Sequence, residues 1–130
     1  MIINVKDIKK SYTVGTQEVN ALRGINLSVE KGEFISIMGP SGSGKTTLMN
    51  IIGCLDTPSS GEYELNGSLV SKLEDDELAR IRNKEIGFVF QSFNLLAKNS
   101  VLENVMLPLK YAGFNKSEAV KKSNEVIDKV

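Results

Sequence analysis

The residues best suited to chemistry lie between Gly39 and Thr47, where the sequence reads GPSGSGKTT. This stretch has the spacing G-x-x-x-x-G-K-S/T, which is typical of a loop that cradles nucleotide phosphates. Glycines permit left-handed backbone and close approach, so successive N–H groups can turn toward phosphate oxygens beside the positive end of a helix. Lys45 would then reach the β- and γ-phosphates, and the Thr46 hydroxyl would hold Mg²⁺.

The sequence on both sides of the loop favours this interpretation, because the motif requires a strand before it and a helix after it. An apolar run at 34–38 is typical of a buried parallel strand. Apolar residues then recur at helical spacing, at Leu48, Ile51, Ile52 and Leu55. The alternative is a Gly/Ser surface turn that happens to precede a lysine. We predict that nucleotide binds through Gly39, Pro40, Ser41, Gly42, Ser43, Gly44, Lys45, Thr46 and Thr47.

Composition limits the class of protein. The 130 residues are one domain by length, and 16 basic and 16 acidic side chains give no net charge, so we expect no nucleic-acid partner. There is no apolar run long enough for a membrane span and no signal-peptide core, which predicts a cytoplasmic protein. The single cysteine, Cys54, is interpreted as a small buried apolar residue on the helix after the loop. The chain contains no histidine.

The remaining sequence predicts two groups of elements. Alternating or apolar patterns predict strands at 2–9, 25–29, 62–66 and 86–90, with a loop around Gly15 between the first two. Helices are predicted at 73–82, with Leu78 and Ile81 inward and acidic residues at its start, from Val101 after a capping box, and from 117 onward. Pro108 is expected to end or kink the second of these helices.

Two residues outside the loop also bear on nucleotide chemistry. Tyr12 lies in the predicted first loop, where an aromatic ring can stack on a purine, although such a tyrosine is also typical of a partly buried anchor. Gln91 follows the predicted strand at 86–90, and its amide could reach Mg²⁺ or position a water. A solvent-facing or helix-capping glutamine is the alternative interpretation.

The chain resembles the first half of an ABC-transporter ATPase subunit. The resemblance rests on SYTVG, on ALRGINLSVEKGEFISIMGPSGSGKTTLMNIIGCLDTPSSGEYELNG, and on IGFVFQSFNLL followed by SVLENVMLPL. Within that family it is similar to the subunits of lipoprotein-release, macrolide and antimicrobial-peptide export systems. By this resemblance Tyr12 stacks on adenine, with Val19 as a possible neighbour of the base, and Gln91 senses Mg²⁺ and the γ-phosphate, which makes Lys45 and Gln91 the catalytic candidates.

The resemblance implies an α/β fold, a P-loop NTPase core with an antiparallel β subdomain at about 1–91 and the start of a helical subdomain at about 92–130. It implies ATP and Mg²⁺ as cofactors, a membrane permease as partner, a second ATPase subunit that completes an ATP sandwich, and a place on the inner face of the membrane. Phe93, Leu95 and Leu96 would lie near the permease surface, or would equally well be packed inside the helical subdomain.

Three features of the family have no counterpart in the chain: the signature motif, the strand ending in Asp-Glu, and the switch histidine. We therefore expect an amino-terminal portion of a longer subunit that binds nucleotide without hydrolysing it. The alternatives are an ABC protein without a transport role, a small-molecule kinase or GTPase, and a non-catalytic nucleotide-binding fragment.

Overall fold

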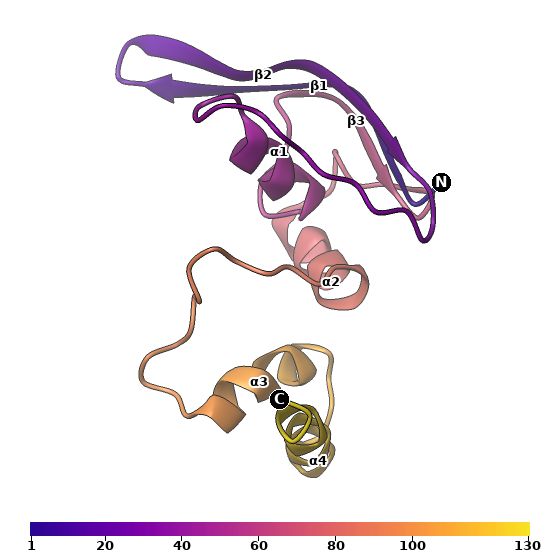
Figure 1. Cartoon of the computed structure of the whole chain (residues 1–130), viewed down its shortest axis with the longest axis vertical. Coiled ribbons are helices and arrows are strands. Elements are labelled where there is room, and N and C mark those ends of the chain that lie inside the picture. The colour runs from indigo at the N-terminus through magenta and orange to yellow at the C-terminus, as the bar shows by residue number, and fades with distance from the viewer. The chain divides into compact units, whose positions relative to one another are not determined.

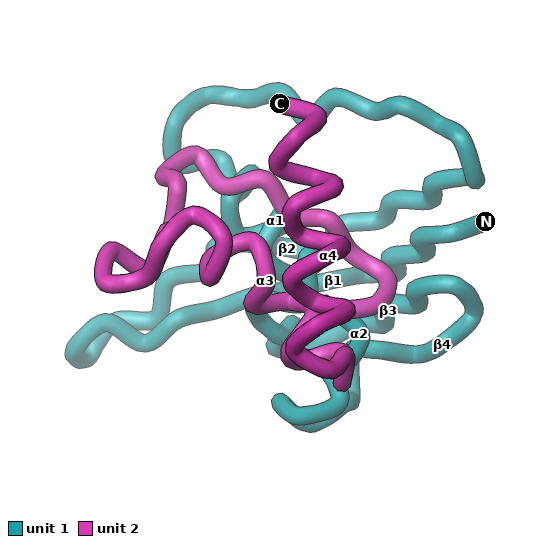
Figure 2. Tube along the Cα trace, turned by 90° about the horizontal axis from the view of Figure 1, so that it is seen from below, with its two compact units in different colours: residues 1–82 teal, residues 83–130 magenta.

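The computed structural model describes all 130 residues and divides the chain into two compact units, residues 1–82 and 83–130 (Figure 2). The elements are β1 (Ile3–Val14), β2 (Gln17–Val29), α1 (Lys45–Ile52), β3 (Ser60–Leu65), β4 (Ser68–Leu69), α2 (Asp75–Glu85), α3 (Val101–Tyr111) and α4 (Lys116–Ile127). None of these helices has the length and apolar character needed to cross a membrane.

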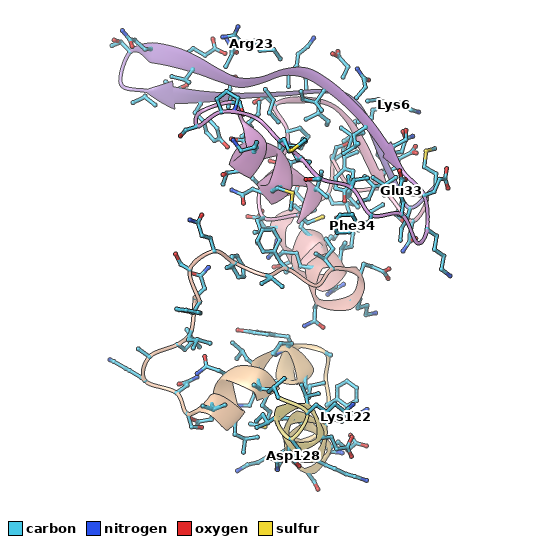
Figure 3. The ribbon with its side chains drawn as sticks, in the orientation of Figure 1. Lys6, Arg23, Glu33, Phe34, Lys122 and Asp128 are labelled. Atoms are coloured by element: carbon cyan, nitrogen blue, oxygen red, sulfur yellow. The ribbon has the colours of Figure 1, made fainter.

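The first unit is built on a four-stranded antiparallel sheet with the order β2-β1-β3-β4. One face of the sheet covers α1 (Figure 1), and the Lys6 and Arg23 side chains project outward from the opposite face (Figure 3). Its core contains Ile8 and Tyr63, which are at most 1% exposed. The buried Tyr63 hydroxyl donates a hydrogen bond to the Ile52 carbonyl oxygen at 2.8 Å, so β3 is tied directly to the end of α1.

A β-bulge at Asp7 sets which side chains of β1 face the core. Asp7 has a φ of 46°, and the register of β1 shifts between Val5 and Ile8 against β2. Val5 and Ile8 are both buried although they are an odd number of residues apart, because the extra residue of a bulge reverses the alternation. Gly61 of β3 lies opposite this bulge, between the pairs that Lys6 and Lys9 form with β3.

The prediction of a loop between the first two strands is wrong. β1 and β2 continue outward as a long hairpin, with Val14 paired to Gln17 across a two-residue turn in which Gly15 has a φ of 63°. Tyr12 therefore lies on a strand, paired with Val19. Both faces of this hairpin tip are largely exposed, so its sequence carries no alternation between apolar and polar residues that would reveal the strands.

The predicted parallel strands at 34–38 and 86–90 are also absent, because no residue of the chain pairs with either segment. Phe34, Met38 and Val89 are 93%, 87% and 95% exposed, respectively. A parallel strand needs hydrogen-bonded neighbours on its edges and cover on its faces, and apolar composition alone supplies neither.

The predicted helices are present, with small changes. α2 begins with Asp75, Asp76 and Glu77 in its first turn and buries Leu78, whereas Ile81 is only half-buried. Cys54 is buried as expected, but it follows the end of α1 and has a φ of 53°.

The second unit contains α3 and α4, which pack against each other. The predicted capping box at Ser100 and Glu103 is confirmed, since each side chain accepts a hydrogen bond from the other residue's backbone N–H. Pro108 does not end α3, which continues to Tyr111 although a proline has no N–H to donate within the helix.

Candidate phosphate-binding site

The start of α1 exposes helix N–H groups beside the glycine-rich loop. Gly44 is the N-cap residue, with a φ of 91°, and no side chain caps the helix. The first helical hydrogen bond runs from the Leu48 N–H to the Gly44 carbonyl oxygen at 2.9 Å, so the N–H groups of residues 45–47 have no acceptor within the helix. These donors and the helix dipole together favour an anion at this end of α1.

Gly44 leaves no room for a side chain, whereas Gly39 lies close to the flexible Ser43 side chain. A Cβ atom on Gly44 would lie 2.7 Å from the Ala21 carbonyl oxygen and 2.9 Å from Leu22 Cδ2, so the helix start packs directly on β2. A Cβ atom on Gly39 would lie 2.7 Å from Ser43 Oγ, across the mouth of the loop. The tight turn of the loop thus depends on glycine at Gly44, whereas the Ser43 hydroxyl could rotate away from a Cβ atom at Gly39.

The Lys45 ammonium lies on the loop itself. Its Nζ donates to the carbonyl oxygens of Gly39 at 2.7 Å and Pro40 at 2.6 Å, and it lies 3.4 Å from Ser43 Oγ. These partners hold a full positive charge beside the partial positive charge of the α1 terminus. The loop therefore combines the Lys45 cation with backbone N–H groups that have no acceptor within the helix, and this is a donor set suited to a phosphate.

Tyr12 belongs to the same unit as the loop and lies close to its last residue. The Tyr12 ring is 39% exposed, and its hydroxyl donates to Asp56 Oδ2 at 2.8 Å. Burial, together with the Asp56 carboxylate, raises the pKa of Tyr12, and the nearby Thr47 side chain opposes that rise in pKa. The structure thus brings together Tyr12 and Thr47, which are far apart in the sequence.

Sequence analysis did not identify Asp56 and Lys10, which both contact the Tyr12 side chain. Lys10 Nζ donates to Asp56 Oδ1 and to the Thr57 carbonyl oxygen, each at 2.6 Å, and lies 5.0 Å from the centroid of the Tyr12 ring. Partial burial raises the pKa of Asp56, but the hydrogen bonds from Lys10, Tyr12 and the Thr57 N–H outweigh it and hold that pKa below its ordinary value. The available sequence signal was the two-residue spacing of Lys10 and Tyr12, which puts both on one face of a strand.

Thr46 and Gln91 are both exposed. Thr46 lies in the first turn of α1, whereas Gln91 belongs to the second unit, so the prediction that they share one Mg²⁺ ion stays a prediction. No group of three or more acidic, cysteine or histidine side chains that could hold a metal ion occurs in the chain.

Comparison with known proteins decides the family. A family model described as "ABC transporter" matches residues 22–130. The chain belongs to the ABC transporter family. The predicted resemblance and the predicted fold class are therefore confirmed.

Individual relatives of this ABC transporter chain agree with that assignment. It is 47% identical over 129 residues to "Uncharacterized ABC transporter ATP-binding protein YknY" of Bacillus subtilis (strain 168), an alignment that covers 99% of the chain and 56% of the relative. It is 56% identical over 112 residues to "Macrolide export ATP-binding/permease protein MacB" of Syntrophobacter fumaroxidans, which covers 86% of the chain and 16% of that protein.

A solved structure of an ABC cassette has the same fold. It is described as the "Dimeric structure of a post-hydrolysis state of the ATP-binding cassette MJ0796 bound to ADP and Pi", and it matches with a TM-score of 0.87 and 46% identity over 95% of this chain and 55% of the other. The ABC transporter chain spans about half the length of YknY and of this cassette.

Proposed function

We propose that residues 39–47 bind the phosphates of ATP, and that the chain acts as the ATP-binding part of an ABC transporter. The observation that carries this proposal is the uncapped start of α1 next to the Lys45 ammonium, at a loop in which Gly44 leaves no space for a Cβ atom. Backbone N–H groups bind the phosphate oxygens there, and Lys45 compensates the charge of the β- and γ-phosphates.

The same proposal gives Thr46 and Gln91 the role of Mg²⁺ ligands. Magnesium in nucleotide sites takes few protein ligands and shares the rest of its coordination with water and phosphate oxygens, so a hydroxyl and an amide oxygen are a chemically suitable pair. Tyr12 is proposed to stack on the adenine base, since its side chain is partly exposed and its hydroxyl lies near Thr47 at the end of the loop. Bound ATP would supply the phosphoanhydride bond whose hydrolysis by water drives transport, and Lys45 and Gln91 are the proposed catalytic residues.

The proposed partners are a membrane permease and a second ATPase subunit, and the proposed location is the cytoplasmic face of the membrane. The name of the MacB relative joins ATP binding to a permease, and the related cassette is a dimer that holds ADP and Pi. The zero net charge of the chain gives no support for a nucleic-acid partner.

Equilibrium binding of Mg-ATP tests the proposal at Lys45. The Lys45→Ala variant is expected to bind ATP at least about tenfold more weakly, because it removes a charge-assisted contact to phosphate. Lys121→Ala, which removes an exposed lysine of α4 in the second unit, is the matched control and is expected to bind as the unchanged chain does. Equal affinities of the two variants for Mg-ATP would contradict the proposal.

A further inference from the structure

The Tyr12 hydroxyl is held by a carboxylate that comes from the far end of α1. Asp56 lies just beyond α1, and its Oδ2 accepts the Tyr12 hydroxyl at 2.8 Å. Its Oδ1 accepts the Thr57 backbone N–H at 2.7 Å, which fixes the carboxylate in a local turn. The orientation of the ring on the hairpin is therefore tied to the segment that follows the phosphate-loop helix.

Lys10 holds the same carboxylate and also lies near one face of the ring. Its Nζ contacts Asp56 Oδ1 and the Thr57 carbonyl oxygen at 2.6 Å and lies 5.0 Å from the ring centroid, within the range of a cation–π contact. The side chain of Lys10 is only 12% exposed, so this ammonium is fixed rather than free in solvent. A cation on one face of an aromatic ring leaves the opposite face for stacking.

We propose that Lys10 and Asp56 are positioning residues that fix the Tyr12 ring so that one face is presented to the base of a bound nucleotide. This inference rests on the proposed function, since it requires phosphate binding at residues 39–47. Neither residue belongs to the loop at 39–47. Their effect is to orient the ring before the ligand arrives, which reduces the conformational entropy lost on binding.

Lys10 and Asp56 are expected to affect binding of the base and not binding of the phosphates. Loss of Lys10 or Asp56 weakens the stacking contact but alters no residue of the loop at 39–47, so ATP and inorganic triphosphate report on different parts of the site. Stacking contributes to affinity through the π-face of any base, and freeing the ring from its anchor forfeits part of that contribution. We expect about a fivefold weaker affinity for ATP and less than about a twofold change for triphosphate.

The experiment measures the binding of Mg-ATP and of inorganic triphosphate by calorimetry for the unchanged chain and for Lys10→Met, Tyr12→Phe, Asp56→Ala and the Tyr12→Phe/Asp56→Ala double variant. Lys9→Met is the matched control, because Lys9 neighbours Lys10 on β1 but pairs with the exposed Asp7 instead. The double variant is expected to bind ATP no more weakly than Asp56→Ala alone, because both changes remove the same hydrogen bond.

Several results would overturn the inference. These are unchanged ATP affinity in both Lys10→Met and Tyr12→Phe, equal losses for ATP and triphosphate, or an additive loss in the double variant. If the unchanged chain binds triphosphate as tightly as ATP, the base makes no contact, so the inference fails while the proposed phosphate site stands. If the unchanged chain binds neither ligand, the proposed function fails, and the inference fails with it.

Discussion

Replacing Gly61 by alanine should destabilise the first unit more than replacing any glycine in an open turn. Gly61 lies on β3 opposite the bulge at Asp7 and has a φ of 97°. A Cβ atom there would press against the Asp7 carbonyl oxygen and would lie 2.7 Å from the Asp7 carbonyl carbon and the Lys6 carbonyl oxygen. All three are backbone atoms, which cannot move aside without breaking the pairing of β1 with β3.

The loss of stability expected for Gly61→Ala has two contributions. Placing a residue with a Cβ at positive φ costs roughly 1–2 kcal/mol. Overpacking against backbone adds about 1–3 kcal/mol. We therefore expect Gly61→Ala to lower the free energy of unfolding by about 3 kcal/mol, a large part of the stability of a domain of this size.

Gly67→Ala separates the two contributions. Gly67 has a φ of 78°, but nothing lies within 4 Å of the Cβ position. Gly67→Ala should therefore lower the free energy of unfolding only by the cost of the positive φ, about 1 kcal/mol. The effect of alanine on the unfolded chain is the same for both variants, so it cancels in the comparison. The difference between the two variants, about 2 kcal/mol, isolates the steric contact at the bulge.

Urea denaturation of both variants, followed by circular dichroism, measures that difference. With an m-value of about 1.5 kcal/mol/M, the midpoint of Gly61→Ala should lie about 1.3 M below that of Gly67→Ala. Identical midpoints would contradict the prediction, because they would mean that the bulge accommodates a methyl group at residue 61 without loss of stability.

Two further predictions concern the hydroxyl of Tyr63 and the carboxylate of Asp56. Tyr63→Phe removes the hydroxyl that donates to the buried Ile52 carbonyl oxygen at 2.8 Å, so urea denaturation should show a free energy of unfolding lower by about 1–2 kcal/mol. Tyr111 is 78% exposed, and Tyr111→Phe should leave the free energy of unfolding unchanged. Because the folded pKa of Asp56 is depressed below 3.8, its ionised form stabilises the fold above that pH, and the contribution is lost as the pH falls through the folded pKa. Unfolding measured from pH 5 to pH 2 should therefore show a shallower acid slope for Asp56→Asn than for the unchanged chain, and equal slopes for the two proteins would contradict this prediction.

Much of the candidate site could be predicted from local sequence. The phosphate loop, the helix after it and the capping box at Ser100 each depend on residues within a few positions of one another, so spacing alone identifies them. The family followed from three motifs in order and is confirmed by a family model that matches residues 22–130. The binding roles of the loop residues, Tyr12 and Gln91 remain predictions.

The errors share one physical cause. The apolar runs at 34–38 and 86–90 have the composition of buried strands, but a strand forms only where another strand supplies hydrogen bonds, and composition does not reveal that partner. The prediction of a loop around Gly15 was wrong for the same reason. The two strands of this hairpin form by pairing with each other, although little of either strand is buried near the turn.

Local sequence was enough to predict the glycine-rich loop at 39–47, the helices and the family, because each is encoded by residue types at short, fixed spacing. The surroundings of Tyr12, in contrast, depend on the tertiary structure. Lys10, Tyr12 and Asp56 come from β1 and from the turn after α1, and their contacts exist because the sheet folds over that helix. The chain folds back to close these contacts across more than forty residues, and no periodicity or spacing in the sequence records such a pairing.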